Sequence, residues 1–162
     1  MNNANIKKIV EDLIATFLYA GQVALDLRDK GLKKKMKSDN TPVSNGDIKV
    51  NEILTTKIKT LTPKLPIISE ESSENKDKEN LNDFWLIDPI DGTYDYINNL
   101  DEFTLNAGLI LDNQPAGGLV FAPAKKRMFY SYGSNNAYEI VGENKVKLEC
   151  SKNFNKNFIK FV

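Results

Sequence analysis

The spacing of apolar residues changes at Phe103 from a helical period to an extended one, and this change limits the fold more than any other feature. Before it, apolar residues recur at three- and four-residue steps over 5–30 and from about Asp47 to Leu61. Gly31 and Pro63 are placed to end these two helices. After it, β-rich segments alternate with turn-forming residues, over 104–111, 117–121, 127–132, 137–141 and 145–149. This order predicts an α+β domain, with two or three helices packed on an antiparallel sheet.

The composition excludes several kinds of chemistry. The 162 residues include no histidine, which removes Ser-His-Asp and Cys-His catalysis and any zinc site built on imidazole. The 22 basic and 22 acidic residues cancel, so a nucleic-acid duplex is not the expected partner. The single cysteine fits a reducing cytoplasm, and no apolar run approaches the ~18 residues that a membrane span needs. We therefore expect a soluble, cytoplasmic protein whose chemistry uses carboxylates, hydroxyls, lysines, backbone groups or a metal.

A short apolar strand over 84–87 ends on two carboxylates three residues apart, Asp88 and Asp91. Neither acid has a lysine or arginine beside it, and an anion near the end of a sheet must be paired, solvated or bound to a cation. Ligands that are all oxygen favour Mg²⁺ over zinc. Pro89 fixes the turn between the acids and directs the carbonyl of Ile90. The sequence therefore predicts a hard divalent cation at this strand end.

Gly92 and Thr93 follow the second acid and begin a short helix that is predicted to reach about Asn99. Free N–H groups at the start of a helix bind anions, and a metal beside them suits a phosphate ester. A turn followed by a capped helix would explain the same Asp-Pro-Ile-Asp-Gly-Thr segment equally well. The motif alone leaves both interpretations open.

Three more acids stand at the ends of predicted elements. Glu70 and Glu71 follow an apolar strand over 65–68, and Asp47 lies three residues after Ser44 in the arrangement of a capping box. Taken singly, the two glutamates are typical of a solvated loop and Asp47 of a first-turn helix acid. Their occurrence together with Asp88 in a chain without histidine favours a shared site.

Two polar segments are predicted to be connectors. The lysine run over 33–37 is typical of a solvated connection, and contact with an anionic substrate is the less favoured alternative. The segment from Ser72 to Asp83 is polar and has no periodicity, which indicates an exposed loop.

Taken together, these segments resemble the inositol monophosphatase superfamily of Mg²⁺-dependent, lithium-sensitive phosphatases. The signature is the run Trp-Leu-Ile-Asp-Pro-Ile-Asp-Gly-Thr over 85–93. The branch that the chain resembles most is the CysQ-type 3′(2′),5′-bisphosphate nucleotidases, on the segments 37–44, 68–71, 102–106 and 118–123. The resemblance implies the N-terminal half of that family's layered fold.

The resemblance also implies roles for individual residues. Mg²⁺ would be bound by Glu70, Asp88, the carbonyl of Ile90, and Asp91. Asp47 would accept a hydrogen bond from Thr93, which together with Glu70 would orient and activate the attacking water. The catalytic set is then Asp47, Glu70 and Thr93. The substrate-binding set is Glu70, Ile90, Asp91, Gly92 and Thr93, with the amides of the last two holding the phosphate.

The implied reaction is the hydrolysis of adenosine 3′,5′-bisphosphate to AMP and phosphate. Inositol monophosphate is an alternative substrate, and a catalytically impaired metal- or phosphate-binding half is an alternative function. The chain departs from the CysQ pattern at residues 94–96, where Tyr-Asp-Tyr stands in place of Lys-Glu-Phe. It also has no Trp-Asp motif of the family's second domain, because its only tryptophan is Trp85. We therefore expect a phosphatase N-terminal domain over 1–150.

Residues 151–162 are expected to begin a missing C-terminal domain. Their apolar end, Phe158–Val162, would favour self-association or pairing with a C-terminal-domain partner. The expected small-molecule partner is a phosphorylated nucleoside or inositol.

Overall fold

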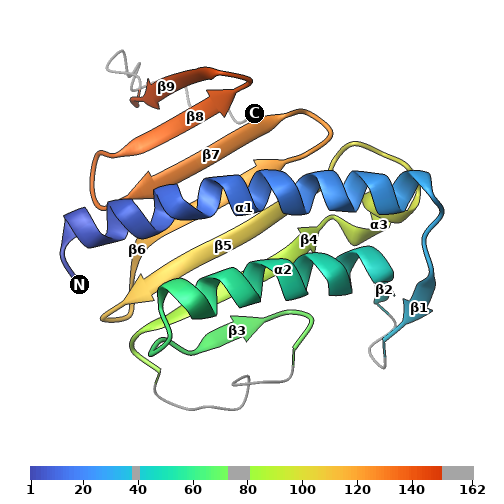
Figure 1. Ribbon diagram of the computed structural model, residues 1–162, viewed down its shortest axis with the longest axis horizontal. Helices are drawn as coiled ribbons and strands as arrows, with labels where there is room; N and C mark the ends of the chain where they lie inside the picture. The colour runs from blue at the N-terminus through green and yellow to red at the C-terminus, as the bar shows by residue number, and fades with distance from the viewer. Residues whose placement is uncertain (38–40, 73–80, 151–162) are drawn as a thin grey trace, which may run out of the picture.

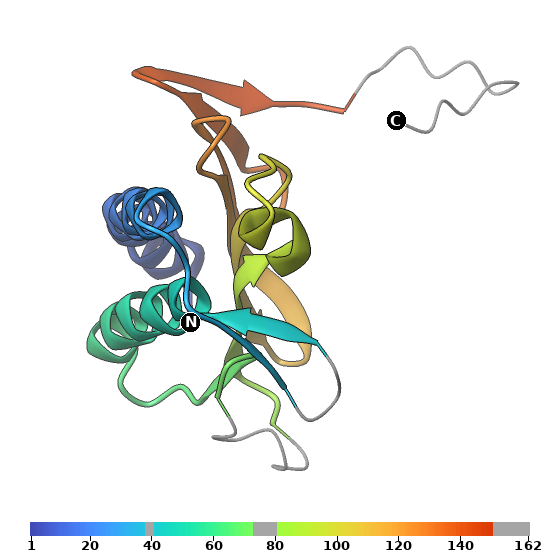
Figure 2. The same ribbon diagram turned by 90° about the vertical axis from the view of Figure 1, so that its right-hand side faces the viewer.

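The computed structural model describes residues 1–37, 41–72 and 81–150, and in it two long helices cover one face of a seven-stranded sheet. Helix α1 (Asn3–Asp29) and helix α2 (Asn45–Leu61) lie side by side on that face (Figures 1 and 2). A third, short helix, α3 (Thr93–Ile97), follows the strand that carries the acidic motif. Among the described residues, no helix is both long enough and apolar enough to cross a membrane.

The ends of the long helices follow local rules that the sequence predicts. The side chain of Asn2 caps α1 by accepting from the amide of Asn5 at 2.9 Å, and Gly31 takes a positive φ of 90° just after the helix. Ser44 caps α2, and its own amide donates to the Asp47 carboxylate, which completes the predicted capping box. Helix α2 begins at Asn45, two residues earlier than predicted.

The sheet has the order β3-β4-β5-β6-β7-β8-β9. Its strands are β3 (Ile67–Ser69), β4 (Phe84–Asp91), β5 (Thr104–Leu111), β6 (Gln114–Ala122), β7 (Arg127–Tyr132), β8 (Ala137–Val141) and β9 (Asn144–Leu148). The predicted bounds of β5, β7 and β8 are confirmed, and so are the α+β class and the antiparallel meander from β4 onward.

The sheet differs from the prediction at one edge, where β3 pairs parallel to β4. A parallel pair needs a crossover of a dozen or more residues, and the 14 residues between Ser69 and Phe84 supply one. The apolar pattern of so short a strand does not reveal its direction. Residues 73–80 of the predicted loop lie outside the described residues.

Strands β4 and β6 are both longer than predicted. Strand β4 continues through Pro89 to Asp91, because a bulge lets its pairing with β5 resume after the proline. Strand β6 begins at Gln114, because the turn before it needs only Asp112 and Asn113, both at positive φ. Helix α3 is shorter than predicted and ends at Ile97.

The prediction that the lysine run is a connector is wrong in part. Lys34–Met36 form strand β1, which pairs antiparallel with β2 (Pro42–Ser44) as a separate hairpin. Hydrogen bonds beyond each end of this pairing extend it, from the Lys37 amide to the Thr41 carbonyl at 2.8 Å and from the Asn45 amide to the Lys33 carbonyl at 3.0 Å. The lysine side chains of β1 are exposed, as expected of a solvated segment.

The core lies between the two helices and the sheet. The indole of Trp85 on β4 is fully buried and donates to the hydroxyl of Thr62, just after α2, at 3.0 Å. Gly21 lets α1 approach the sheet closely, because a Cβ there would lie 2.3 Å from the ring of Phe121. The other large, fully buried side chains are Phe17, Leu13, Leu54, Ile58, Ile87, Ile90, Tyr96, Phe103, Leu105, Leu109 and Leu119.

Tyr96 joins α3 to α1 and so fixes the segment that follows the acidic motif. Its hydroxyl donates to the Ala24 carbonyl at 2.7 Å, and burial raises its pKa. Gly46 leaves room for this ring, since a Cβ there would lie 2.3 Å from the hydroxyl oxygen.

We predict that Tyr96→Phe lowers the free energy of unfolding by about 1 kcal/mol, because the buried hydrogen bond from the Tyr96 hydroxyl to the Ala24 carbonyl is lost while the ring packing is kept. Tyr94→Phe is the matched control, because the Tyr94 side chain is exposed and should tolerate the same change. Urea unfolding of the three proteins measures the difference. Equal stability of both variants would contradict the role of this hydrogen bond.

Candidate functional site

A β-bulge brings Asp88 and Asp91 to the same side of the sheet. Residues three apart in a regular strand point to opposite faces. Here Asp88 pairs with Asn106 and Asp91 with Thr104, so β4 carries one residue more than β5 over this stretch. The Asn106 amide donates to the Asp91 carboxylate at 3.2 Å. The bulge therefore turns a plain strand end into a pair of neighbouring carboxylates.

Two buried oxygens at this bulge have no hydrogen-bond partner among the residues that the structure describes. They are Oδ1 of Asp88 and Oδ1 of Asn106, which sit on paired residues of β4 and β5. An unsatisfied buried acceptor is costly, and a carboxylate oxygen more so. The pair of acceptors is suited to a cation or a donor that enters from outside.

Glu70 adds a further negative charge beside Asp88. It directly follows β3, and its amide donates to the Ile87 carbonyl at 3.1 Å, which sets it next to the acidic end of β4. Burial, the charge of Glu70 and a hydrogen bond with it raise the pKa of Asp88 to about 7, and Asp91 contributes in the same direction. The strand end therefore concentrates more negative charge than its surroundings satisfy.

Asp47 accepts a hydrogen bond from Thr93 next to this cluster. Its buried carboxylate accepts from the amide and hydroxyl of Ser44 at 2.8 and 2.6 Å, and from the hydroxyl of Thr93 at 3.1 Å. The Thr93 hydroxyl also lies 2.9 Å from the Ile90 carbonyl. A hydroxyl has one proton, so these two acceptors share or exchange it.

Gly92 is required by the backbone that links the acids to α3. Its φ is 88°, and a Cβ there would lie 2.6 Å from the Glu102 carbonyl. A pocket of about 380 Å³ opens beside it, lined by the acids Asp91, Asp95, Asp101 and Glu102 together with Lys125 and four neighbours. Glu102 is paired with Lys125 at 2.6 and 2.7 Å.

Lys37 occupies the outer side of the cluster. Its ammonium lies 2.8 Å from Glu70 and 2.6 Å from Glu71. Burial opposes the charge on Lys37, but the hydrogen bonds to both glutamates raise its pKa. Burial likewise raises the pKa of Glu71, and the ammonium acts against that change. The end of the β1–β2 hairpin is thus tied to the acids by an ion pair.

The structure brings the sequence-predicted residues together at the end of β4. Asp88 and Asp91 lie at the bulge, Glu70 beside them, and the hydrogen bond between Thr93 and Asp47 has the implied partners. Their catalytic and metal-binding roles remain predictions. Sequence reasoning missed Asn106, whose position opposite Asp88 depends on strand register. It also missed the ion pairs of Lys37 with Glu70 and Glu71, since it placed the lysine run either in solvent or beside an anionic substrate.

The donor set fits a hard divalent cation. All candidate ligands are oxygens, and Oδ1 of Asp88 is a buried acceptor with no partner in the described part of the chain. Within residues 1–37, 41–72 and 81–150, however, no three acidic or thiol side chains form a ready-made metal cage. The ammonium of Lys37 forms an ion pair with the Glu70 carboxylate. A cation bound at Glu70 would therefore share this carboxylate with the ammonium.

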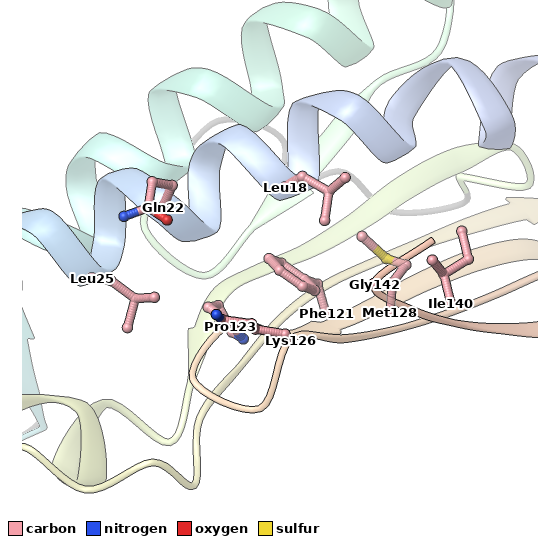
Figure 3. Close-up of a pocket in the computed structure, with 9 residues that line it drawn as sticks. All are labelled: Leu18, Gln22, Leu25, Phe121, Pro123, Lys126, Met128, Ile140 and Gly142. Atoms are coloured by element: carbon pink, nitrogen blue, oxygen red, sulfur yellow. The ribbon is translucent and has the colours of Figure 1, made fainter. Parts of the chain in front are cut away.

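A second pocket lies away from these acids, between α1 and the sheet. Figure 3 shows Leu18, Gln22 and Leu25 of α1 above Phe121 and Met128, around a space of about 270 Å³. Its lining is mostly apolar and contains no acidic residue. The pocket therefore offers no carboxylate ligand for a metal ion, and its charged residue is Lys126.

Comparison with known proteins agrees with this geometry. Residues 5–159 match the sequence model of the inositol monophosphatase family. The chain belongs to this family. Two similar relatives are named 3′(2′),5′-bisphosphate nucleotidase CysQ, from Aggregatibacter actinomycetemcomitans and Haemophilus influenzae, at 34% and 33% identity. The matches cover 81% and 94% of this chain but 49% and 55% of the relatives. The chain thus spans about half the length of these family members.

Solved structures of the inositol monophosphatase family have the same fold. CysQ from Bacteroides thetaiotaomicron matches at 25% identity with a TM-score of 0.61, covering 82% of this chain and 49% of that one. An inositol monophosphatase from Thermotoga maritima matches at 20% identity with a TM-score of 0.73, covering 88% and 54%. The α+β fold expected from the family resemblance is thereby confirmed.

We predict that Asp88→Asn stabilises the metal-free protein at pH 8 and changes it little near pH 4. The folded state raises the pKa of Asp88 to about 7, so its proton is held more tightly in the folded than in the unfolded chain. The stability that this proton contributes is present below the unfolded pKa and is lost as the pH rises from about 4 to about 7. Partial exposure screens the effect, and we expect a gain of about 1–2 kcal/mol at pH 8.

Urea unfolding in the presence of a chelator, at both pH values, measures this gain. Asp12→Asn is the control, because Asp12 is exposed on α1. A variant at Asp88 that is less stable than the parent at pH 8 would contradict the electrostatic description of the strand end.

Proposed function

We propose that this chain carries the metal- and phosphate-binding part of a Mg²⁺-dependent phosphomonoesterase whose substrate is adenosine 3′,5′-bisphosphate. The observation that supports it most is the bulge in β4, which sets Asp88 and Asp91 beside Glu70 and directly before Thr93. Membership of the inositol monophosphatase family supports the class of reaction. The CysQ names of the relatives favour the nucleotide over inositol monophosphate.

The proposed ligands of Mg²⁺ are Glu70, Asp88, Asp91 and the carbonyl of Ile90. The three carboxylates supply the negative charge at the strand end. The Ile90 carbonyl, which accepts from Thr93, has a second lone pair for a cation. A bound divalent cation would neutralise the charge of the phosphate ester and make a water molecule more acidic. Asn106 holds the Asp91 carboxylate in orientation through its amide.

The proposed task of Asp47 and Thr93 is to orient the attacking water. The buried Asp47 carboxylate draws the proton of the Thr93 hydroxyl toward itself, because its other oxygen is already bound by Ser44. The Thr93 oxygen can then accept a hydrogen bond from one O–H of the water, while Glu70 accepts the other and takes up the single proton that the water loses as it attacks. The amides of Gly92 and Thr93 would bind the phosphate oxygens.

We predict that the chain releases phosphate from adenosine 3′,5′-bisphosphate with Mg²⁺, slowly, and that Asp88→Asn and Thr93→Val each reduce the rate at least about tenfold. Phosphate release with Mg²⁺ and with a chelator measures the effect. Asp12→Asn serves as the control. Unchanged turnover in Asp88→Asn would contradict the mechanism. A higher kcat/KM for inositol 1-phosphate in the same assay would replace the proposed substrate with the alternative.

We also propose that the sheet face opposite α1 and α2 is covered by the further half that the relatives possess. Figure 2 shows both long helices on one side of the sheet. On the other face, Leu86 is 52% exposed and Val146 56% exposed. One row of paired residues across this face has small side chains, and this leaves a groove of about 440 Å³. The row consists of Gly108, Gly118, Ser131 and Ala137, and Leu148 stands at its end.

This face reaches the candidate site. The neighbouring row of paired residues begins at Asp88 and Asn106 and continues through Val120 to Phe129. A Cβ at Gly108 would meet no atom within 4 Å, so a partner can approach the backbone there. Polypeptide packed on the face would therefore border the acids and could contribute to the substrate site. An impaired half that needs such a partner is the second candidate function.

We predict that the 162-residue chain self-associates through this face when it is studied alone, because exposed apolar surface is stabilised by contact. Val120→Lys should shift the protein toward monomer by placing a charge on the face. Tyr19→Lys is the matched control, since Tyr19 is 61% exposed on α1. Sedimentation velocity measures the distribution. A parent chain that stays monomeric at high concentration would contradict this use of the face.

A further inference from the structure

Lys37 differs from the other lysines that form ion pairs in the described residues. Its ammonium bridges two glutamates, and its side chain is 22% exposed. The Lys49–Glu52, Lys125–Glu102 and Lys145–Glu11 pairs each have one partner, and their lysines are at least 42% exposed. An ammonium that is partly withdrawn from water and shared by two carboxylates is held much more firmly than an exposed one.

The two glutamates that hold Lys37 are not equivalent. The side chain of Glu71 is 8% exposed, whereas that of Glu70 is 45% exposed. Glu70 also hydrogen-bonds to Asp88, whereas Glu71 acts on Asp88 only through its charge. Lys37 therefore contacts the proposed metal-binding cluster directly through Glu70 and is held beside it by the more buried Glu71.

The ammonium and a divalent cation would compete for the same carboxylate. Lys37 neutralises part of the charge that makes the cluster attractive to a cation, and two positive charges at one carboxylate repel each other. Glu70 makes both contacts at once, because its side chain bonds to the ammonium of Lys37 and also to Asp88. The hairpin of β1 and β2 carries this ammonium to the cluster (Figure 1).

We infer that Lys37 is a built-in counter-cation that occupies Glu70 when the divalent cation is absent and must be displaced from it for the cation to bind. This inference rests on the proposed metal site. Glu71 retains the displaced ammonium, so Lys37 remains beside the cluster rather than entering solvent. Lys37 is thus a positioning residue that sets the affinity of the site for the divalent cation.

The test compares Lys37→Met with Lys49→Met in two measurements that need no turnover. Lys49→Met removes the same charge from an exposed pair. Calorimetric titration with Mg²⁺ should give about tenfold tighter binding for Lys37→Met than for the parent, within the usual range of coupling between two ligands. Lys49→Met should bind as the parent does. Lys37→Gln provides the same comparison if the methionine variant does not fold.

Thermal unfolding supplies the second readout. With a chelator, Lys37→Met should melt below the parent, because Glu70 and Glu71 lose their counter-cation. With saturating Mg²⁺ it should gain more in Tm than the parent does. If Lys37 had a role in folding alone, the substitution would lower the Tm with chelator and the Tm with Mg²⁺ by the same amount.

Each outcome decides between the two proposals. Equal or weaker Mg²⁺ binding by Lys37→Met, with binding by the parent, would overturn the counter-cation inference and leave the metal site standing. Absence of Mg²⁺ binding from both proteins would overturn the metal site and, with it, the inference. Tighter Mg²⁺ binding by Lys37→Met, with a lower Tm in chelator and a larger gain in Tm on adding Mg²⁺, would establish the counter-cation inference.

Discussion

The bulge between Asp88 and Asp91 is the constraint on which the site depends. It cancels the alternation of the strand, so that two acids three residues apart face the same region. Every other feature of the site is arranged around this irregularity. Strand β3 runs parallel to β4 and sets Glu70 beside it, and the capping box of α2 fixes Asp47 under Thr93. The two long helices cover only one face of the sheet (Figure 2).

The electrostatic balance of the metal-free protein is unfavourable at this point. An unsatisfied oxygen of Asp88 is buried, and its neighbours carry the same charge. Folding tolerates such a cluster only if the rest of the core compensates, and the packing of Trp85 and the helices does so. Lys37 reduces the repulsion without removing it. The cost is most simply explained by a cation that the folded protein is built to accept.

The sequence predicts the regular parts of this structure well and the irregular parts poorly. Periodicity locates α1 and three strands of the meander, because the spacing of the residues that must be buried differs between a helix and a strand. The bulge, the parallel direction of β3 and the ion pair of Lys37 all depend on contacts between distant segments, which local pattern does not record. The acids of the site are recognisable because their chemistry is unusual at strand ends. Asn106 is not, because only the register of β5 sets it opposite Asp88.

The most direct test of the central claim is the position of a divalent cation in the folded protein. Crystals soaked in Mn²⁺ should show an anomalous peak within about 2.5 Å of carboxylate oxygens of Asp88 and Asp91. Glu70 should have turned toward the peak, with Lys37 retained on Glu71 alone. A peak elsewhere, or no peak at millimolar Mn²⁺ with Lys37 still bound to Glu70, would contradict the account.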